Sequence, residues 1–185
     1  IRKRQPEFRE AKMLRYKEEF DLPEYDIDII TASKHMADLF EATVALGGQP
    51  KKVSNWLMVE TLRLLKENGL DAEDIRFSPE NLSKLIRMTD AKEINSSVAK
   101  EVFEAMFKEN VDPEAYVEEK GLKTVNDEGA LRKTVEQVIA ENPQSVEDYR
   151  NGKEKAIGFL VGQTMKAMKG KADPGMVNKL LKELL

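Results

Sequence analysis

Apolar side chains recur every three or four residues along nearly the whole chain, which is the spacing of one face of an α-helix. Between Lys51 and Asn68 they cover more than half of the helical circumference, as is typical of a central, mostly buried helix. No stretch sustains the apolar–polar alternation and β-branched enrichment of a strand. The pattern therefore predicts an all-α fold of about ten helices joined by short connections.

Small polar residues, glycine and proline mark where these helices begin and end. Leu22-Pro23 ends a first helix at residues 5–20, because the residue before a proline is pushed out of helical geometry. Gly47-Gly48 and Gly170 supply further helix ends. We expect N-terminal caps at these polar residues: Thr31, Ser78, Asn95 or Ser96, Asn126 and Asp173.

These boundaries predict two domains. A helical domain of about six helices occupies residues 1–112, with its first helix inside residues 1–22. Residues 113–122 form a linker, and residues 123–185 form a small helical tail domain. A chain of 185 residues is long enough for two small domains, each with a modest core.

Composition excludes several classes of protein. The hydrophobic content of 41% and charged content of 35% fit a soluble globular protein. No apolar run approaches the ~18 residues of a membrane span, and no signal peptide precedes the first helix. The absence of cysteine excludes disulfides, thiolate metal sites and thiol catalysis, and is compatible with a cytoplasmic location. The chain starts at Ile1 rather than at methionine, so we expect it to be a piece of a longer protein.

The residues needed for catalysis or metal binding do not come together in this sequence. His35 is the only histidine, which leaves no partner for a ligand cluster or a catalytic triad. Asp26-Ile27-Asp28 lacks the remaining ligands and the glycine of a calcium loop. Gly170-Lys171 lacks both the upstream glycine and the strand of a phosphate-binding loop. We expect no catalytic residue, no metal site and no cofactor within this chain.

The helix expected from Lys153 to Gly170 has one unusual face. Ile157, Leu160, Val161, Thr164, Met165 and Met168 form its apolar stripe. The opposite side, here called the glycine–lysine face, consists of Lys155, Gly158, Gly162, Lys166 and Lys169. Each glycine weakens a helix interior by roughly 0.8–1 kcal/mol relative to alanine, so two on one stripe indicate close approach by another group. Two interpretations remain open: a phosphate backbone between the lysines, or a neighbouring helix packed against the glycines.

Charge is unevenly distributed over a chain whose net charge is −4. Residues 111–149 carry ten acidic side chains and four basic ones, whereas residues 150–185 carry eight basic side chains and three acidic ones. A basic end on an acidic protein indicates a local footprint for an anionic partner, although charge runs are more often solvated surface.

Several segments resemble one known family. The end of the chain, GFLVGQTMKAMKGKADPGMVNKLLKE (Gly158–Glu183), is similar to the C-terminal signature of the B subunit of aspartyl/glutamyl-tRNA amidotransferase, which also occurs in the YqeY-type domain. Upstream similarity includes RYKEEFDLPEYDIDIIT, VSNWLMVETLRLL, FSPENLSKLIRM and INSSVAKEVFEAMF, so the resemblance covers essentially the whole chain.

The resemblance implies a role for this region in translation. The full enzyme of that family is a ligase that amidates Glu or Asp misacylated onto glutamine or asparagine tRNA. It uses ATP, Mg²⁺ and ammonia that its glutaminase A subunit releases from glutamine, and it also contains a small C subunit. The catalytic domain of the B subunit lies outside this chain. The helical and YqeY-type tail domains resemble the part that holds the tRNA, so we expect tRNA rather than DNA or a membrane as the partner.

The candidate contacts with tRNA lie in the tail. Lysines suit phosphate contacts and glycines give clearance, which fits RNA recognition through shape and backbone. Phe159 is expected to pack on a neighbouring helix rather than to stack on a base. An alternative function is a protein-interaction scaffold that packs against another subunit or domain without touching RNA. The predicted tRNA-binding residues are Lys155, Gly158, Gly162, Gln163, Lys166, Lys169, Lys171 and Asn178.

Overall fold

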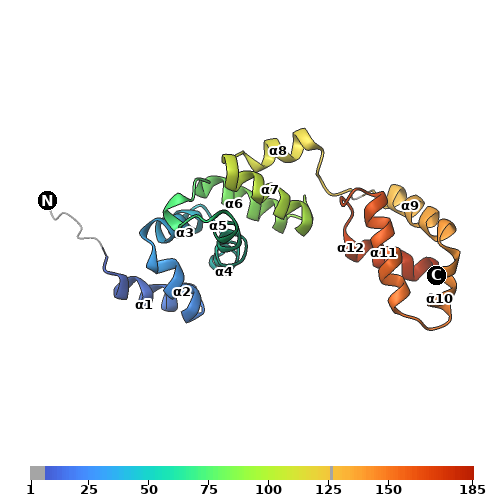
Figure 1. Ribbon diagram of the computed structural model, residues 1–185, viewed down its shortest axis with the longest axis horizontal. Coiled ribbons are helices and arrows are strands. Elements are labelled where there is room, and N and C mark those ends of the chain that lie inside the picture. The colour runs from blue at the N-terminus through green and yellow to red at the C-terminus, as the bar shows by residue number, and fades with distance from the viewer. Residues whose placement is uncertain (1–6, 126) are drawn as a thin grey trace. The chain divides into compact units, whose positions relative to one another are not determined.

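The computed structural model describes residues 7–125 and 127–185, and every regular element in these ranges is helical (Figure 1). The all-α prediction is confirmed. The elements are α1 (Arg9–Phe20), α2 (Glu24–Ala32), α3 (Lys34–Ala45), α4 (Pro50–Asn55), η1 (Trp56–Thr61), α5 (Leu62–Asn68), η2 (Ala72–Asp74), α6 (Pro79–Asp90), α7 (Ser96–Glu109), α8 (Pro113–Lys120), α9 (Glu128–Glu141), α10 (Pro143–Arg150), α11 (Lys155–Ala167) and α12 (Pro174–Leu184).

The chain divides into two compact units. Unit 1 comprises Ile1–Asp90 and Lys100–Glu119, and unit 2 comprises Ala91–Ala99 and Lys120–Leu185. Unit 2 therefore includes the segment that leads into α7 and the first turn of that helix. The domain boundaries expected from the sequence, with a linker at residues 113–122, stay a prediction.

Unit 1 has more helical elements than the sequence pattern indicated. The segment after Leu22-Pro23 forms the separate helix α2, and Thr31, the expected N-cap, lies inside it and donates to the carbonyl of Ile27 at 2.7 Å. The cap of α3 is Ser33, whose hydroxyl accepts from the amide of Met36 at 3.2 Å. The prediction of Thr31 as a cap is wrong because both residues are good caps and only backbone geometry distinguishes them.

One predicted helix is interrupted by a π-helical segment. The expected helix at residues 51–68 begins at Pro50 and is built from α4, η1 and α5, with η1 as a six-residue π-helix. A π-turn adds a residue per turn and so shifts which side chains face inward. Leu57 is fully buried as expected, whereas Val59 is 51% exposed. Glu60 of η1 is buried and pairs with Arg63 at 2.9 Å and Lys100 at 3.2 Å.

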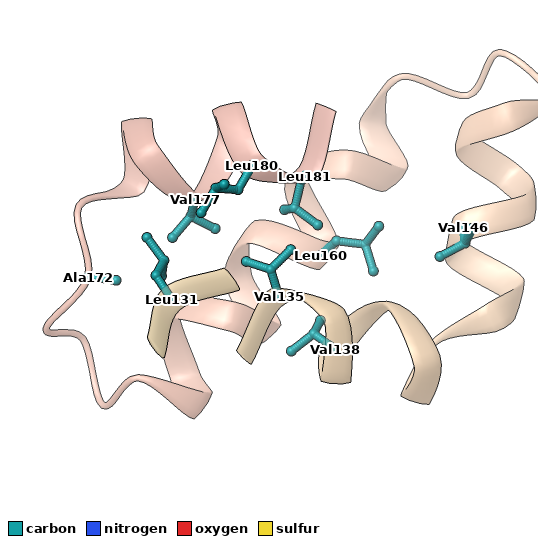
Figure 2. Packing of buried hydrophobic residues seen from close by; sticks show 9 residues of the cluster. All are labelled: Leu131, Val135, Val138, Val146, Leu160, Ala172, Val177, Leu180 and Leu181. Carbon is teal, nitrogen blue, oxygen red and sulfur yellow. The ribbon is translucent and has the colours of Figure 1, made fainter. Parts of the chain in front are cut away.

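Unit 2 is a small helical bundle with its own core. Figure 2 shows side chains from α9, α11 and α12 meeting between these helices, among them Val135, Leu160 and Leu181. The N-cap of α9 is Asp127, whose carboxylate accepts from Gly129 at 2.9 Å and Ala130 at 3.3 Å. This corrects the expected cap at Asn126, a residue that lies outside the described ranges. The buried members of the core are Leu131, Val135, Val138, Val146, Leu160, Ala172, Val177, Leu180 and Leu181.

Three other predicted caps are confirmed by hydrogen bonds. Ser78 accepts from the amide of Asn81 at 3.2 Å, and Asn95 accepts from that of Val98 at 2.9 Å. The carboxylate of Asp173 accepts from Gly175 at 2.7 Å at the start of α12, with Pro174 as the first helical residue. Each cap satisfies a backbone donor that the first turn of a helix would otherwise leave unpaired.

Candidate nucleic-acid interface

Helix α11 separates into the two faces that its sequence predicts. Leu160 and Thr164 are buried, and the hydroxyl of Thr164 donates to the carbonyl of Leu160 at 2.9 Å. The partly buried residues Ile157, Val161, Met165 and Met168 pack against the same core. Because this apolar side is held by α9, α10 and α12, the opposite side of α11 is turned away from the core of unit 2.

The two glycines of α11 face open space. A Cβ atom built on Gly158 or Gly162 would meet no atom within 4 Å, apart from the backbone of α11 itself and the adjoining residues. Both residues are exposed. Close packing of a neighbouring helix of this chain therefore does not explain them within the described residues. The space beside these glycines is open to an external partner, and both RNA and another protein could use it.

The lysines of this surface carry uncompensated charge. Across residues 7–125 and 127–185, no carboxylate lies within ion-pair distance of Lys155, Lys166, Lys169 or Lys171. Two other lysines of unit 2 differ in this respect, since Lys153 pairs with Asp148 at 2.9 Å and Lys179 pairs with Glu183 at 3.9 Å. An ammonium group without a partner inside the protein can bind an external anion without first breaking an ion pair.

Lys169 lies beyond α11 rather than on its helical face. The helix ends at Ala167, and Lys169 adopts a left-handed backbone conformation with φ of 53°. Its amide donates to the carbonyl of Lys166 at 3.0 Å, and that of Gly170 donates to Met165 at 2.8 Å. These bonds form a Schellman motif, whose left-handed position is usually glycine. The prediction that Lys169 continues the helical stripe is therefore wrong, and the residue projects from the turn that follows it.

Lys171 lies in the loop between α11 and α12, which is anchored by residues from elsewhere in unit 2. The carbonyl of Lys171 accepts from the amide of Val125 at 2.8 Å. The side-chain amide of Asn95 donates to the carbonyls of Gly170 and Ala172, the latter at 3.2 Å. The sequence identified Asn95 only as a cap, because contacts across 75 and more residues leave no local signal.

The other side chains considered for tRNA contact or packing, those of Gln163, Asn178 and Phe159, differ in how far they are buried. Gln163 is half-buried, next to Gly162 in the sequence. The carbonyl oxygen of the Asn178 side chain is buried and has no hydrogen-bond partner within the described residues. Phe159 is 49% exposed, so its expected packing on a neighbouring helix stays a prediction.

The described part of the chain shows no metal-binding or membrane-spanning feature. None of its groups of histidine, aspartate and glutamate could hold a metal ion. None of its helices has the length and apolar content needed to cross a membrane.

Two grooves of about 420 and 470 Å³ in unit 1 share Lys51 and Asn55. Their lysines are already paired, Lys51 with Asp21 and Lys52 with Asp90, each at 2.5 Å.

Comparison with known proteins identifies the relatives of this chain. A family model described as "GatB domain" matches residues 38–185. The chain belongs to the GatB family. It is 66% identical over all of its 185 residues to the B subunit of the aspartyl/glutamyl-tRNA(Asn/Gln) amidotransferase of Agathobacter rectalis. The proteins of the same name from Lachnoclostridium phytofermentans and Geobacillus thermodenitrificans are 61% and 53% identical, over 100% and 96% of the chain.

The GatB chain described here is shorter than these relatives. It spans 39% of the Agathobacter rectalis and Lachnoclostridium phytofermentans proteins and 37% of the Geobacillus thermodenitrificans protein. The resemblance to the helical and YqeY-type tail region of the B subunit is confirmed by the family match and by these identities.

Proposed function

We propose that this GatB chain binds glutamine or asparagine tRNA and positions the misacylated tRNA for transamidation during translation. The ligase chemistry, with its ATP and Mg²⁺, would belong to the rest of the protein. The described residues do not fit a metal of their own, because their carboxylates do not cluster in threes. The glutaminase A subunit and the small C subunit would be its protein partners, in the cytoplasm.

The surface of α11 is the observation that supports this proposal. Two exposed glycines with no neighbour within 4 Å lie between lysines that have no ion-pair partner within the described residues. A phosphate backbone needs such a surface, because lysine supplies mobile positive charge and glycine allows close approach. Recognition of structured RNA depends largely on shape, phosphates and 2′-hydroxyl groups, so an aromatic stacking platform is not required.

Binding of tRNA over a series of salt concentrations tests the proposal. Lys155, Lys166, Lys169 and Lys171 would be changed together to alanine. For each phosphate contact that is lost, we expect the salt slope of log K to fall by roughly 0.7–0.9. The matched control changes Lys133, Lys153, Lys179 and Lys182 to alanine, which removes the same charge from the same unit outside the proposed surface.

The two variants give distinct outcomes. Weaker and flatter binding in the first variant, with the control close to wild type, supports RNA on the exposed side of α11 and the loop that follows it. Equal losses in both variants would indicate only a general charge effect and would contradict the assignment of this face. If tRNA binding is unchanged in both variants and salt-insensitive binding to the A or C subunit is lost on changing Gly162 to leucine, the protein-interaction scaffold is the better description.

A further inference from the structure

Three segments that are distant in the sequence meet at one place in unit 2. The carbonyl of Glu93 accepts from the amide of Thr124 at 2.8 Å. The next residue, Val125, donates its amide to the carbonyl of Lys171, also at 2.8 Å. The side chain of Asn95 donates to the carbonyls of Gly170 and Ala172. The loop between α11 and α12 is therefore held by backbone and side-chain bonds from two other segments.

Asn95 uses its whole side-chain amide in this junction. Its oxygen accepts from the amide of Val98 at 2.9 Å and caps α7. Its NH₂ group has two hydrogens and donates to two carbonyls, those of Gly170 and Ala172. Serine and aspartate can replace asparagine as a cap, but neither supplies this pair of donors. The cap and the loop anchor can therefore be separated by substitution.

The anchored loop contains two of the lysines assigned to tRNA. Lys169 and Lys171 immediately flank Gly170, whose carbonyl Asn95 binds, and Lys171 also precedes the second acceptor, Ala172. Two donors on one side chain fix the backbone on both sides of Lys171. A loop that is already ordered loses little conformational entropy when the ligand binds, and this smaller cost raises the affinity.

We propose that Asn95 is a positioning residue for the tRNA contact: its NH₂ group holds the α11–α12 loop so that Lys169 and Lys171 are presented together to the phosphate backbone. This inference rests on the proposed tRNA-binding function. It gives the start of α7 a role in tRNA recognition, which is to hold the α11–α12 loop in place. Asn95 itself acts through the loop and need not touch the RNA.

Substitution of Asn95 by serine in the 185-residue chain separates its two roles. The serine hydroxyl keeps an acceptor for the amide of Val98, adds no charge, and is too short to bind both loop carbonyls. Hydrogen exchange is expected to accelerate at the amide of Val125, which bonds Lys171, while that of Val98 stays protected. Asn142→Ser is the matched control, because the Asn142 side chain donates to Val138 at 2.8 Å in the same unit, away from the loop.

Binding of a glutamine or asparagine tRNA transcript then tests the positioning role. We expect Asn95→Ser to weaken binding about threefold to tenfold, the range expected when one or two hydrogen bonds are lost. Introduced into a variant that already has Lys169→Ala and Lys171→Ala, the same substitution should have no further effect, because contacts between residues acting as a unit are not additive. Asn95→Asp, which is isosteric and keeps the cap, should match Asn95→Ser in the exchange experiment.

The outcomes distinguish failure of the inference from failure of the proposed function. If changing Lys169 and Lys171 leaves tRNA binding intact, the proposed function of this loop is wrong whatever Asn95 does. If the lysine changes weaken binding but Asn95→Ser does not, or if Asn95→Ser weakens it equally in both backgrounds, Asn95 is only a structural residue and the inference is overturned. A matching loss in Asn142→Ser would also overturn it.

Discussion

Gly158 and Gly162 lie four residues apart on the exposed side of α11, and a Cβ atom on either would meet nothing within 4 Å. Helical glycine normally costs roughly 0.8–1 kcal/mol relative to alanine. Packing within the described residues does not require either glycine. The stability lost by having glycine at these two positions is explained if an external ligand approaches the α11 backbone closely.

Alanine at Gly158 or Gly162 should stabilise unit 2 and weaken tRNA binding. Each substitution is expected to raise the free energy of unfolding by about 0.5–1 kcal/mol, because alanine restricts the unfolded chain and fits the helix. Thermal unfolding and tRNA titration measure the two effects. Gly175→Ala is the contrasting control, since a Cβ there would lie 2.9 Å from the capping oxygen of Asp173 and should lower stability. A drop in stability for Gly162→Ala would show that an atom does pack there.

Lys169→Gly should separate stability from binding in the α11–α12 turn. The left-handed conformation of Lys169, with φ of 53°, costs a non-glycine residue about 1 kcal/mol. Glycine removes this strain together with the amine, whereas Lys169→Ala removes the amine alone. We expect both variants to lose tRNA affinity equally and Lys169→Gly to melt at a higher temperature than Lys169→Ala. Equal melting temperatures of the two variants would show that Lys169 is not strained. Wild-type tRNA affinity in both variants would show that the Lys169 amine makes no phosphate contact.

The spacing of apolar residues in the sequence predicted the features that depend on neighbouring residues within one helix. The buried side of α11 followed from helical spacing, as Leu160 and Thr164 show. The π-helix at Trp56–Thr61 could not be predicted, because its sequence is also a good α-helix and tertiary packing decides between them. The second role of Asn95 depends on a loop 75 residues away. The candidate site was thus predicted as a set of lysines and glycines, but not the residue that anchors its loop.

Leu160→Ala should destabilise unit 2 selectively. Leu160 is completely buried at the middle of α11 and belongs to a core formed by α9, α10, α11 and α12 (Figure 2). Truncation of a buried leucine typically costs about 2–5 kcal/mol, through lost burial and the cavity left behind. Hydrogen exchange should show faster opening at residues 128–185 and little change in α2 and α3. An equal loss of protection in both units would contradict separate cores.

In unit 1, Glu41 joins α3 to α1 through a cluster of donors. Its carboxylate accepts from the hydroxyl of Tyr16 at 2.8 Å and pairs with Lys12 at 3.0 Å and Arg15 at 2.9 Å. Partial burial acts to raise the pKa of Glu41, but the hydrogen bonds from Tyr16, Lys12 and Arg15 outweigh it, so the pKa lies below its ordinary value of 4.5. Burial, together with the bond to Glu41, raises the pKa of Tyr16. The hydroxyl of Tyr16 thus stays protonated and remains a donor.

Glu41→Gln should therefore lower stability in a pH-dependent way. A carboxylate whose pKa is depressed by folding contributes stability that is complete above pH 4.5 and disappears as the pH falls through the folded-state pKa. Because Glu41 is about one-third exposed, solvent screening limits the expected loss at neutral pH to about 1 kcal/mol. Urea unfolding from pH 7 to pH 3 should show the difference between wild type and variant shrinking below pH 4.5. Glu136→Gln, which alters an exposed pair with Arg132, should follow wild type throughout. A difference independent of pH would show that Glu41 stabilises unit 1 through shape and packing rather than through its charge.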